Sequence, residues 1–320
     1  MGQREIDEKY MRRGLQLAAC GQEGAPPNPM VGAVIVHNGR IIGEGYHQRC
    51  GEAHAEVNAI ASVLEKDKHL LPESTIYVSL EPCAHYGKTP PCAKLIIEKQ
   101  IPTVVVGCRD PFARVDGRGI TMLRETGIEV REGILEKECL WLNRRFITFH
   151  TQRRPYITLK WAQSKDGYID RHRTSAEEPP VKFSTPATQA LVHKLRAENN
   201  AILVGRRTYE LDRPSLTVRY WHGKNPQPVV LSRNGANGQT ATSLPSLLTE
   251  LYNHGVQTLL VEGGAQTLQS FIDSGIWDEA RIETAPFTLS DGIRAPKIKG
   301  KEGEKLLIDG NSIAFIYKIS

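Results

Sequence analysis

The sequence predicts an α/β protein of two domains, residues 1–150 and 155–320. Two observations carry this prediction. First, 320 residues exceed what a single hydrophobic core usually organises. Second, strand-like and helix-like segments alternate along the chain, stop at the polar, proline-containing stretch 151–155, and begin again with a strand. Each half therefore has the elements of a complete layered α/β domain.

The first half begins with an amphipathic helix, because Met11, Leu15 and residues 17–19 are apolar at helical spacing. The turn Asn38-Gly39 separates two strands. Pro91 precedes an apolar-periodic run, which predicts a helix that begins at Cys92. In chain order we expect a helix at 8–19, strands at 31–36 and 40–44, a helix from His54 to Leu64, a strand at 75–80, the Cys92 helix, a strand at 102–107, a helix at 120–126, a strand at 128–131 and a helix at 135–149.

The second half begins with residues 156–162, where apolar and polar side chains alternate as in a strand. Thr185-Pro186 is typical of a helix start, and Gly255 of a helix end. We expect strands at 156–162, 201–204, 228–231, 258–261, 281–284, 305–308 and 312–319, and helices at 185–196, 244–253 and 265–273.

The composition is that of an ordinary globular protein, with 40% hydrophobic and 24% charged residues. The net charge of +5 is mildly basic, but no long Lys/Arg block predicts a nucleic-acid partner. No apolar run of 18 residues predicts a membrane span, and the polar start of the chain does not have the pattern of a secretion signal. The six cysteines are therefore expected to be reduced thiols of a cytoplasmic protein.

Four residues of the first half have the chemistry of a catalytic zinc site. His54, Cys83 and Cys92 offer one imidazole and two thiolates, which leaves the fourth tetrahedral position open for water. Glu56 lies two residues from the imidazole and is free to move protons. Zinc nucleobase deaminases have this pattern, His-x-Glu followed by Pro-Cys-x-x-Cys. A structural zinc and two buried apolar cysteines are the alternatives.

The second cysteine departs from the general deaminase pattern, because it follows the first by nine positions instead of three. The intervening loop contains His85 and Lys88, two candidate partners for a phosphate. Since Cys92 is expected to begin a helix, the helix dipole would favour its thiolate. The long loop is therefore compatible with a site for one metal ion.

By pattern alone, the second half of the sequence gives less information about its function than the first half does. Glu262-Gly263-Gly264 between a strand and a helix suits a phosphate, but it also suits an ordinary tight turn. The absence of Gly-x-Gly-x-x-Gly argues against a standard dinucleotide-binding domain. Charged residues such as Lys160, Arg196 and Asp212 can equally be solvated surface groups.

Several segments, taken in order, resemble one family along nearly the full chain. In the first half they are 28–36, 45–49, His54-Ala55-Glu56 and the run from Glu81 to Cys92; in the second they are 155–160, 164–167, 195–197, 201–205, 212–219 and 262–264. The sequence resembles the bifunctional riboflavin biosynthesis deaminase/reductase family. The nine-residue step between the cysteines is a mark of this family.

The resemblance implies a cytidine-deaminase-like three-layer α/β/α domain followed by a dihydrofolate-reductase-like α/β domain. The first would hydrolyse an amine from 2,5-diamino-6-(5-phosphoribosylamino)pyrimidin-4(3H)-one with zinc, and the second would reduce the ribosyl group with NADPH. Catalysis by Glu56 and zinc ligation by His54, Cys83 and Cys92 follow from the match. The deaminase substrate would meet Asn28, His47, His85 and Lys88.

For the reductase half the resemblance implies substrate contacts from Arg196, Leu216, Arg219 and Glu262. It implies cofactor contacts from Lys160, Gln163, Thr208, Asp212, Ser232, Gly264, Ala265, Gln266 and Thr267. The chain departs from the family at 179–185, where Pro180 and Lys182 replace a polar and an aromatic residue. It departs again at Arg206 and Arg207, which either meet the phosphates of NADPH or narrow the cleft.

Two other functions remain open from the sequence. A nucleoside or tRNA deaminase with an accessory domain would act without NADPH, and a zinc-stabilised binding module would have no activity to lose. The resemblance also implies a homo-oligomer, a dimer or a tetramer, acting on a small phosphorylated substrate.

Overall fold

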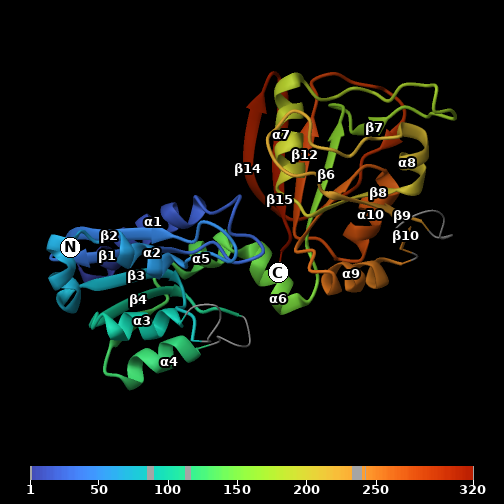
Figure 1. The fold of residues 1–320 in the computed structure, drawn as a ribbon. Helices are drawn as coiled ribbons and strands as arrows, with labels where there is room; N and C mark the ends of the chain where they lie inside the picture. Colours follow the sequence, from blue (N-terminus) through green and yellow to red (C-terminus); the bar gives the residue numbers. More distant parts are fainter. Residues whose placement is uncertain (1, 85–89, 112–116, 233–239, 242, 320) are drawn as a thin grey trace. The chain divides into compact units, whose positions relative to one another are not determined.

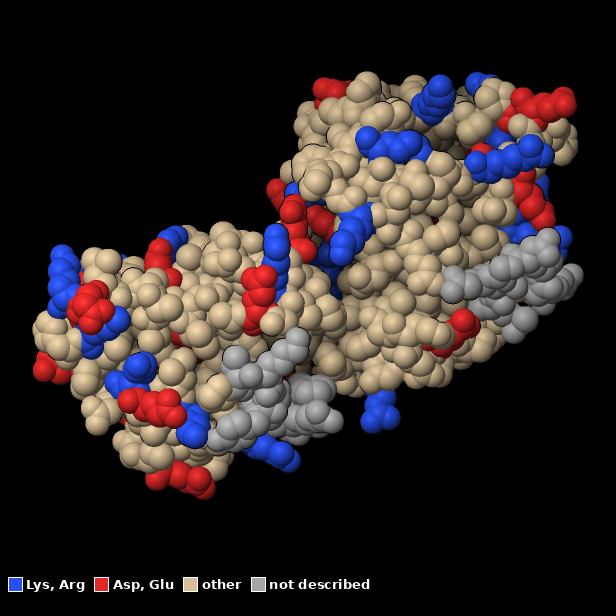
Figure 2. Space-filling view, in the orientation of Figure 1, with Lys and Arg blue, Asp and Glu red and all other residues tan. Residues whose placement is uncertain are grey.

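The computed structural model describes residues 2–84, 90–111, 117–232, 240–241 and 243–319. The chain divides into two compact units, Met1–Gln152 and Arg153–Ser320 (Figure 1). Among the described residues, no helix has the length and apolar character needed to cross a bilayer. On the face shown in Figure 2, Lys and Arg side chains are interspersed with Asp and Glu, without the continuous basic field that marks a nucleic-acid surface.

The first unit is a five-stranded sheet between two layers of helices. The strand order is β2-β1-β3-β4-β5, in which β1 is antiparallel to β2 and β3, and β3, β4 and β5 are parallel. Its elements are α1 (Gln3–Ala19), β1 (Gly32–His37), β2 (Arg40–Tyr46), α2 (Ala55–Ala61), the 3-10 helix η1 (Glu65–Glu73), β3 (Thr75–Leu80), α3 (Cys92–Glu98), β4 (Thr103–Cys108), α4 (Arg118–Glu125), β5 (Glu129–Glu132), α5 (Glu136–Leu142) and α6 (Arg144–Gln152).

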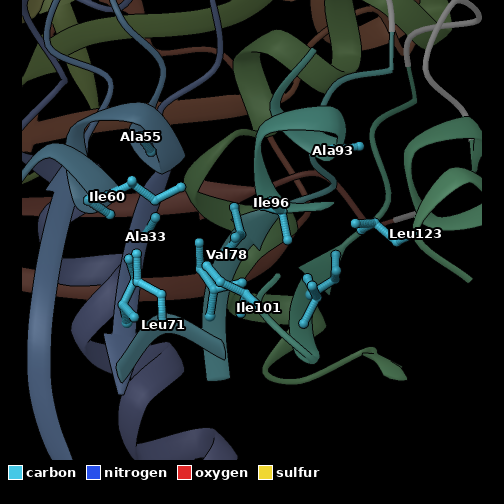
Figure 3. Close-up of a cluster of buried hydrophobic side chains, with 14 of the residues drawn as sticks. Ala33, Ala55, Ile60, Leu71, Val78, Ala93, Ile96, Ile101 and Leu123 are labelled. Atoms are coloured by element: carbon cyan, nitrogen blue, oxygen red, sulfur yellow. The ribbon is translucent and has the colours of Figure 1, made fainter. Parts of the chain in front are cut away.

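The two faces of this sheet follow the two-residue period of its strands. Ala33 and Ile35 of β1 face the core shared with α2, α3 and α4 (Figure 3), whereas Val34 and Val36 face α1 and α5. Both sets are buried, so the central strands are apolar without alternation. The sheet therefore holds the ends of its parallel strands and the first turns of its covering helices in fixed positions.

The second unit is an eight-stranded sheet of order β10-β9-β8-β11-β6-β12-β15-β14, in which β15 is antiparallel to both of its neighbours, β12 and β14, and the other pairs are parallel, with a separate β13-β7 pair. Its elements are β6 (Tyr156–Gln163), β7 (Tyr168–Asp170), α7 (Pro186–Ala197), β8 (Ala201–Gly205), α8 (Arg206–Asp212), β9 (Gln227–Leu231), β10 (Thr240–Ala241), α9 (Leu244–Asn253), β11 (Thr258–Glu262), α10 (Ala265–Asp273), β12 (Glu279–Thr284), β13 (Ile293–Arg294), β14 (Lys301–Ile308) and β15 (Asn311–Tyr317). Helices α9 and α10 pack on one face, and α7 packs on the other.

Most of the predicted elements are present, and the expected helix at 135–149 is the clearest error. The chain forms α5 and α6 instead, separated at Asn143. The Asn143 side chain donates to the carbonyl of Met30 at 2.9 Å and accepts from its N–H at 2.8 Å. This pair of hydrogen bonds, to a residue 113 positions away, competes with continuous helical pairing. The expected helix 54–64 is also shorter, and it ends at Ala61.

Candidate active sites

Three side chains that could hold a metal ion converge in the first unit. His54 is the N-cap of α2, Cys83 follows the end of β3, and Cys92 is the first residue of α3. His54 Nδ1 lies 3.5 Å from Cys83 Sγ and 3.3 Å from Cys92 Sγ, and the ligand atoms all lie within 4.8 Å of one another. Tetrahedral zinc with ordinary bond lengths would separate such atoms by about 3.6 Å. The donor set and its spacing therefore fit zinc, with one position left for water.

The candidate group for proton transfer in this site is Glu56, in the first turn of α2. Its side chain is 3% exposed. Burial, and then the nearby Cys83 sulfur, raise the pKa of Glu56 to about 7. A carboxyl group with that pKa can both accept and return a proton at neutral pH. The hydrogen bond with Cys92, followed by contacts with His54, lowers the pKa of Cys83 to about 4, so this sulfur is ready to bind a cation.

A second imidazole borders the metal ligands. His47 is buried, and its ring meets that of His54 edge-on at 5.4 Å. Its Nδ1 lies 3.0 Å from the carbonyl of Ala53 and its Nε2 lies 3.1 Å from Asn28 Nδ2. The carbonyl can only accept, so Nδ1 carries the proton and Nε2 accepts from Asn28. The structure thus brings Asn28 and His47 to the metal ligands. His85 and Lys88 lie outside the described residues.

Sequence reasoning assigned no role to Glu81, which the structure shows to be an anchor. Its buried carboxylate accepts hydrogen bonds from the backbone N–H groups of Gly117 and Gly119 at 3.0 Å, with longer contacts from Asp110 and Ile120. It thereby ties the end of β3, two residues before Cys83, to the first turn of α4. A charged residue directly after a buried strand was the available signal.

The second unit contains two cavities that share a wall. The smaller, of about 250 Å³, is lined by Lys160, Ser184, Gln189, Val192, His193, Arg196, Arg219, Tyr220 and Glu262. The larger, of about 1060 Å³, is lined by residues from the ends of β6, β8, β9 and β11 and from the starts of α8, α9 and α10. Lys160 and Glu262 line both cavities. They are paired neighbours on β6 and β11.

The shared wall is charged and buried. Arg196 donates from Nε and Nη2 to the two oxygens of Glu262, at 3.0 and 2.7 Å. Burial alone would raise the pKa of Glu262, but the Arg196 hydrogen bonds and charge outweigh it and hold that pKa below the usual range. Burial lowers the pKa of Lys160. The predicted substrate residues Arg196, Arg219 and Glu262 thus meet in the smaller cavity.

Leu216, the fourth predicted substrate residue, lines the larger cavity instead. It is buried and has a φ of +52°. A branched side chain rarely adopts this left-handed backbone conformation, and such strain gathers at binding sites.

Two strand-to-helix turns meet at the floor of the larger cavity. A Cβ on Gly205 would lie 2.3 Å from Thr267 Oγ1, and one on Gly264 would lie 2.9 Å from Thr208 Oγ1. Gly263 and Gly264 also have positive φ values of 83° and 71°. Glycine is required here because the β8–α8 turn and the β11–α10 turn touch. Hydroxyl and backbone N–H groups from both turns are the donors that a phosphate group uses.

Most of the predicted cofactor residues line this larger cavity, namely Lys160, Thr208, Asp212, Ser232, Gly264, Ala265, Gln266 and Thr267. Gln163 lies outside both cavities, and its Oε1 accepts from Trp161 Nε1 at 2.8 Å. Asp212 forms an ion pair with Arg173, a buried residue that also pairs with Asp170 at 2.7 Å. Sequence reasoning did not single out Arg173.

The two departures from the family pattern also lie at the larger cavity. Arg206 and Arg207 line it, and Arg206 is bound to Glu210 at 2.6 Å. From the segment 179–185, Pro180 and Phe183 line it, whereas Lys182 is exposed and lines neither cavity. Phe183 stacks on Phe287, with ring centroids 5.6 Å apart and nearly parallel planes. The segment therefore supplies an aromatic wall despite its altered sequence.

Comparison with known proteins agrees with this geometry. Residues 4–108 match the cytidine and deoxycytidylate deaminase zinc-binding region, and residues 155–313 match the RibD C-terminal domain. The riboflavin biosynthesis protein RibD of Aquifex aeolicus is 38% identical over 91% of this chain and 90% of its own length. The RibD of Bacillus amyloliquefaciens is 36% identical over 97% and 92%. The chain belongs to the RibD family.

Solved structures lead to the same family. A diaminohydroxyphosphoribosylaminopyrimidine deaminase/5-amino-6-(5-phosphoribosylamino)uracil reductase of Thermotoga maritima superposes with a TM-score of 0.87 at 34% identity, over 99% of this chain and 100% of its own. Acinetobacter baumannii RibD superposes with a TM-score of 0.88 at 29% identity, over 99% and 100%. The expected fold class is confirmed, with a cytidine-deaminase-like domain before a dihydrofolate-reductase-like domain.

Membership of the RibD family gives the chain two activities. It is a bifunctional deaminase and reductase of riboflavin biosynthesis, with a zinc-binding deaminase domain and a RibD-type reductase domain that suggests a nicotinamide cofactor.

Proposed function

We propose that residues 1–150 deaminate 2,5-diamino-6-(5-phosphoribosylamino)pyrimidin-4(3H)-one and that residues 155–320 then reduce the ribosyl group with NADPH. The convergence of His54, Cys83, Cys92 and the buried Glu56 within one unit carries the first assignment. The second is supported by the two adjoining cavities of the other unit and their common residues Lys160 and Glu262.

In the deaminase unit, His54 and the sulfurs of Cys83 and Cys92 would hold the zinc ion. Zinc, when bound, brings the pKa of a water towards neutrality and so provides a nucleophile. Glu56 takes a proton from the attacking water and returns it to the departing amine, because its pKa of about 7 suits both steps. Its burial keeps other water away from this exchange.

The pyrimidine ring of the substrate would lie against Asn28 and His47. Because Asn28 Nδ2 is held by His47 Nε2 at 3.1 Å, the amide oxygen of Asn28 is oriented by that contact and can accept from a ring N–H or amine. Burial lowers the pKa of His47, which keeps the ring neutral and this orientation stable. His85 and Lys88, carried by the loop between the cysteines, are proposed from sequence to meet the phosphate.

In the reductase unit, the substrate would occupy the smaller cavity and NADPH the larger. Lys160, Arg196 and Arg219 outnumber the one carboxylate, Glu262, so the smaller cavity suits a sugar phosphate. NADPH, when bound, supplies a hydride for C1′ of the ribosyl group. The Gly264–Thr267 turn and Thr208 would hold its diphosphate. Lys160 and Glu262 would lie where the two ligands meet.

Three further proposals concern the cofactor preference, the location and the assembly of the protein. Arg206 and Arg207 at the larger cavity support NADPH over NADH, since an additional phosphate favours additional cations. We also propose a cytoplasmic homo-oligomer, a dimer or tetramer, which sedimentation of the purified protein would test.

One experiment tests both activities. Purified protein is given the diaminopyrimidine phosphate, and the ring absorbance is followed with and without NADPH. We expect deamination without NADPH, and NADPH oxidation only after deamination has begun. Deamination without any NADPH oxidation would refute the reductase assignment. Deamination of cytidine in place of the diaminopyrimidine phosphate would refute the proposed substrate.

A further inference from the structure

His193 has an unusual position in the smaller cavity of the reductase unit. It lies on α7 one turn before Arg196, and only 4% of its surface is exposed. Its ring lines the cavity together with Lys160, Arg196 and Arg219. A buried imidazole among three cations calls for an explanation, because most buried polar groups have their hydrogen bonds satisfied within the protein.

The hydrogen bonding of His193 fixes which ring nitrogen carries the proton. Its Nδ1 accepts a hydrogen bond from the backbone N–H of Arg219 at 2.8 Å. Nδ1 is therefore unprotonated, and in the neutral ring the proton is on Nε2. Burial, followed by the charges of Arg196 and Arg219, lowers the pKa of His193, so the ring is neutral near pH 7. In the described part of the chain no residue forms a hydrogen bond with Nε2 of His193, so this N–H can serve a ligand in the cavity that the ring lines.

The surrounding charges indicate what an Nε2–H donor would meet. Glu262 is the one carboxylate of the cavity lining, and both of its oxygens are bound by Arg196. The ammonium of Lys160 and the guanidinium of Arg219 complete the cationic lining. An anion with several acceptor oxygens matches this arrangement of two charged donors and one neutral donor.

We propose that His193 is a substrate-binding residue of the reductase, donating a hydrogen bond from Nε2–H to the phosphate group of the sugar phosphate. This inference rests on the proposed function of the smaller cavity and adds a binding residue to it. The same histidine holds the backbone of Arg219 through Nδ1, so one ring contacts the phosphate and positions the neighbouring residue of the cavity wall.

A purely structural role is the competing explanation. In that case His193 would only hold the Arg219 backbone and pack against Tyr220, whose ring it meets edge-on at 4.8 Å. The two roles use different nitrogen atoms, so two substitutions separate them. His193→Asn keeps an acceptor near Nδ1 and removes the Nε2–H donor, whereas His193→Gln places an amide near Nε2 and removes the Nδ1 acceptor.

The test uses the full-length protein and ribose 5-phosphate, with ribose as the probe that lacks the phosphate. Calorimetry measures the affinity of each variant for both sugars and for NADP⁺, and steady-state assays give KM and kcat with the deaminated substrate. For His193→Asn we expect a loss of ribose 5-phosphate affinity of about tenfold or more, with a raised KM and little change in kcat. For His193→Gln we expect most of the affinity to remain.

The controls distinguish this inference from the proposed function. NADP⁺ binding and the deamination rate should stay at the wild-type level in both variants, which shows that both units are folded. Wild-type affinity in His193→Asn, or equal losses in the two variants, would show that His193 acts only through Arg219 and would overturn the proposal. Wild-type protein that oxidises NADPH but binds ribose 5-phosphate no better than ribose would overturn it as well, while leaving the reductase function intact.

Discussion

Arg196 and Glu262 form a two-point ion pair in which each side chain is 12% exposed, on the wall that separates the two cavities of the reductase unit. The pair keeps a carboxylate ionised at a place where burial would otherwise favour its neutral form. The third nitrogen of Arg196, Nη1, donates to the carbonyl of Thr217 at 3.1 Å, so every nitrogen of the guanidinium is held in place by the protein.

Arg196→Met should destabilise the reductase unit by about 3 kcal/mol, because it leaves the Glu262 carboxylate buried without its partner. Glu262 has a lowered pKa in the folded wild type, so its contribution to stability is present above the unfolded pKa and is lost as the pH falls. In the variant the pKa of Glu262 rises, and protonation of its carboxylate removes the cost of burying an unpaired charge. The difference in free energy of unfolding should thus begin to shrink above about pH 4.3, as the pH falls through the raised pKa of Glu262 in the variant, and shrink further below it as the wild type loses its contribution. A constant difference from pH 7 to pH 4 in urea titrations would contradict this reasoning.

Glu56→Gln should reduce the deamination rate by at least about 100-fold, since the amide cannot carry a proton. Reduction of the supplied deaminated intermediate should continue at the wild-type rate. Zinc content, measured by mass spectrometry, should not change, because Glu56 is not expected to be a ligand. His54→Ala is the matched control that should lose both zinc and deamination. Loss of both activities in Glu56→Gln would argue against separate sites.

Removal of the metal ion by a chelator should stop deamination and leave NADPH-dependent reduction unchanged. The three expected ligands all belong to the first unit, and a bound ion stabilises only the unit that holds it. Thermal unfolding should accordingly show a lower midpoint for one of two transitions. Added Zn²⁺ should restore both deamination and that midpoint; a chelated protein that still deaminates would rule out catalytic zinc.

Arg207→Ala should weaken NADP⁺ binding by roughly tenfold while changing NAD⁺ binding little, as expected when a cation that meets the additional phosphate is removed. Arg206→Ala is the control with a smaller effect, because Arg206 is already paired with Glu210. Fluorescence titration with both nucleotides measures the difference. If Arg207→Ala binds NADP⁺ and NAD⁺ as tightly as the wild type does, Arg207 narrows the cleft and does not contact a phosphate.

Asp212→Asn should lower the reduction rate about tenfold or more and spare deamination. Its carboxylate pairs with the buried Arg173, so the substitution removes one of the two carboxylates that neutralise that guanidinium and alters the wall of the larger cavity. Coupled assays of each half-reaction measure the two rates. Equal loss in both reactions would indicate a general folding defect.

Local signals in the sequence were sufficient for much of the fold. Thr185-Pro186 predicts the start of α7, and the Thr185 hydroxyl indeed accepts from the N–H of Thr188. The break at Asn143 was not predictable, because its cause is a contact with Met30, far away in the chain. The short elements β7, α8, β10 and β13 were also missed, since two to seven residues contain too little periodicity to be recognised.

The same limit applies to the sites. His54, Glu56 and the two cysteines follow from their chemistry and order, and the structure brings them together. Gln163 was expected at the cofactor, but its alternation on β6 places it beside Trp161. His193 was not predicted as a site residue, because a single histidine in an amphipathic helix has no distinctive pattern. Its distance of three residues from Arg196 could have drawn attention to it, because such residues share a helix face.

The common wall of the two cavities has a thermodynamic consequence. A sugar phosphate and a dinucleotide would both face the single charge of Lys160 and the ion-paired Glu262, so each ligand changes the electrostatic environment that the other enters. The affinities for the two ligands are then linked, and the linkage is reciprocal. The factor by which the sugar phosphate changes the affinity for the dinucleotide equals the factor by which the dinucleotide changes the affinity for the sugar phosphate. The charge that one ligand places beside Lys160 and Glu262 therefore helps to set the affinity that the other ligand meets there.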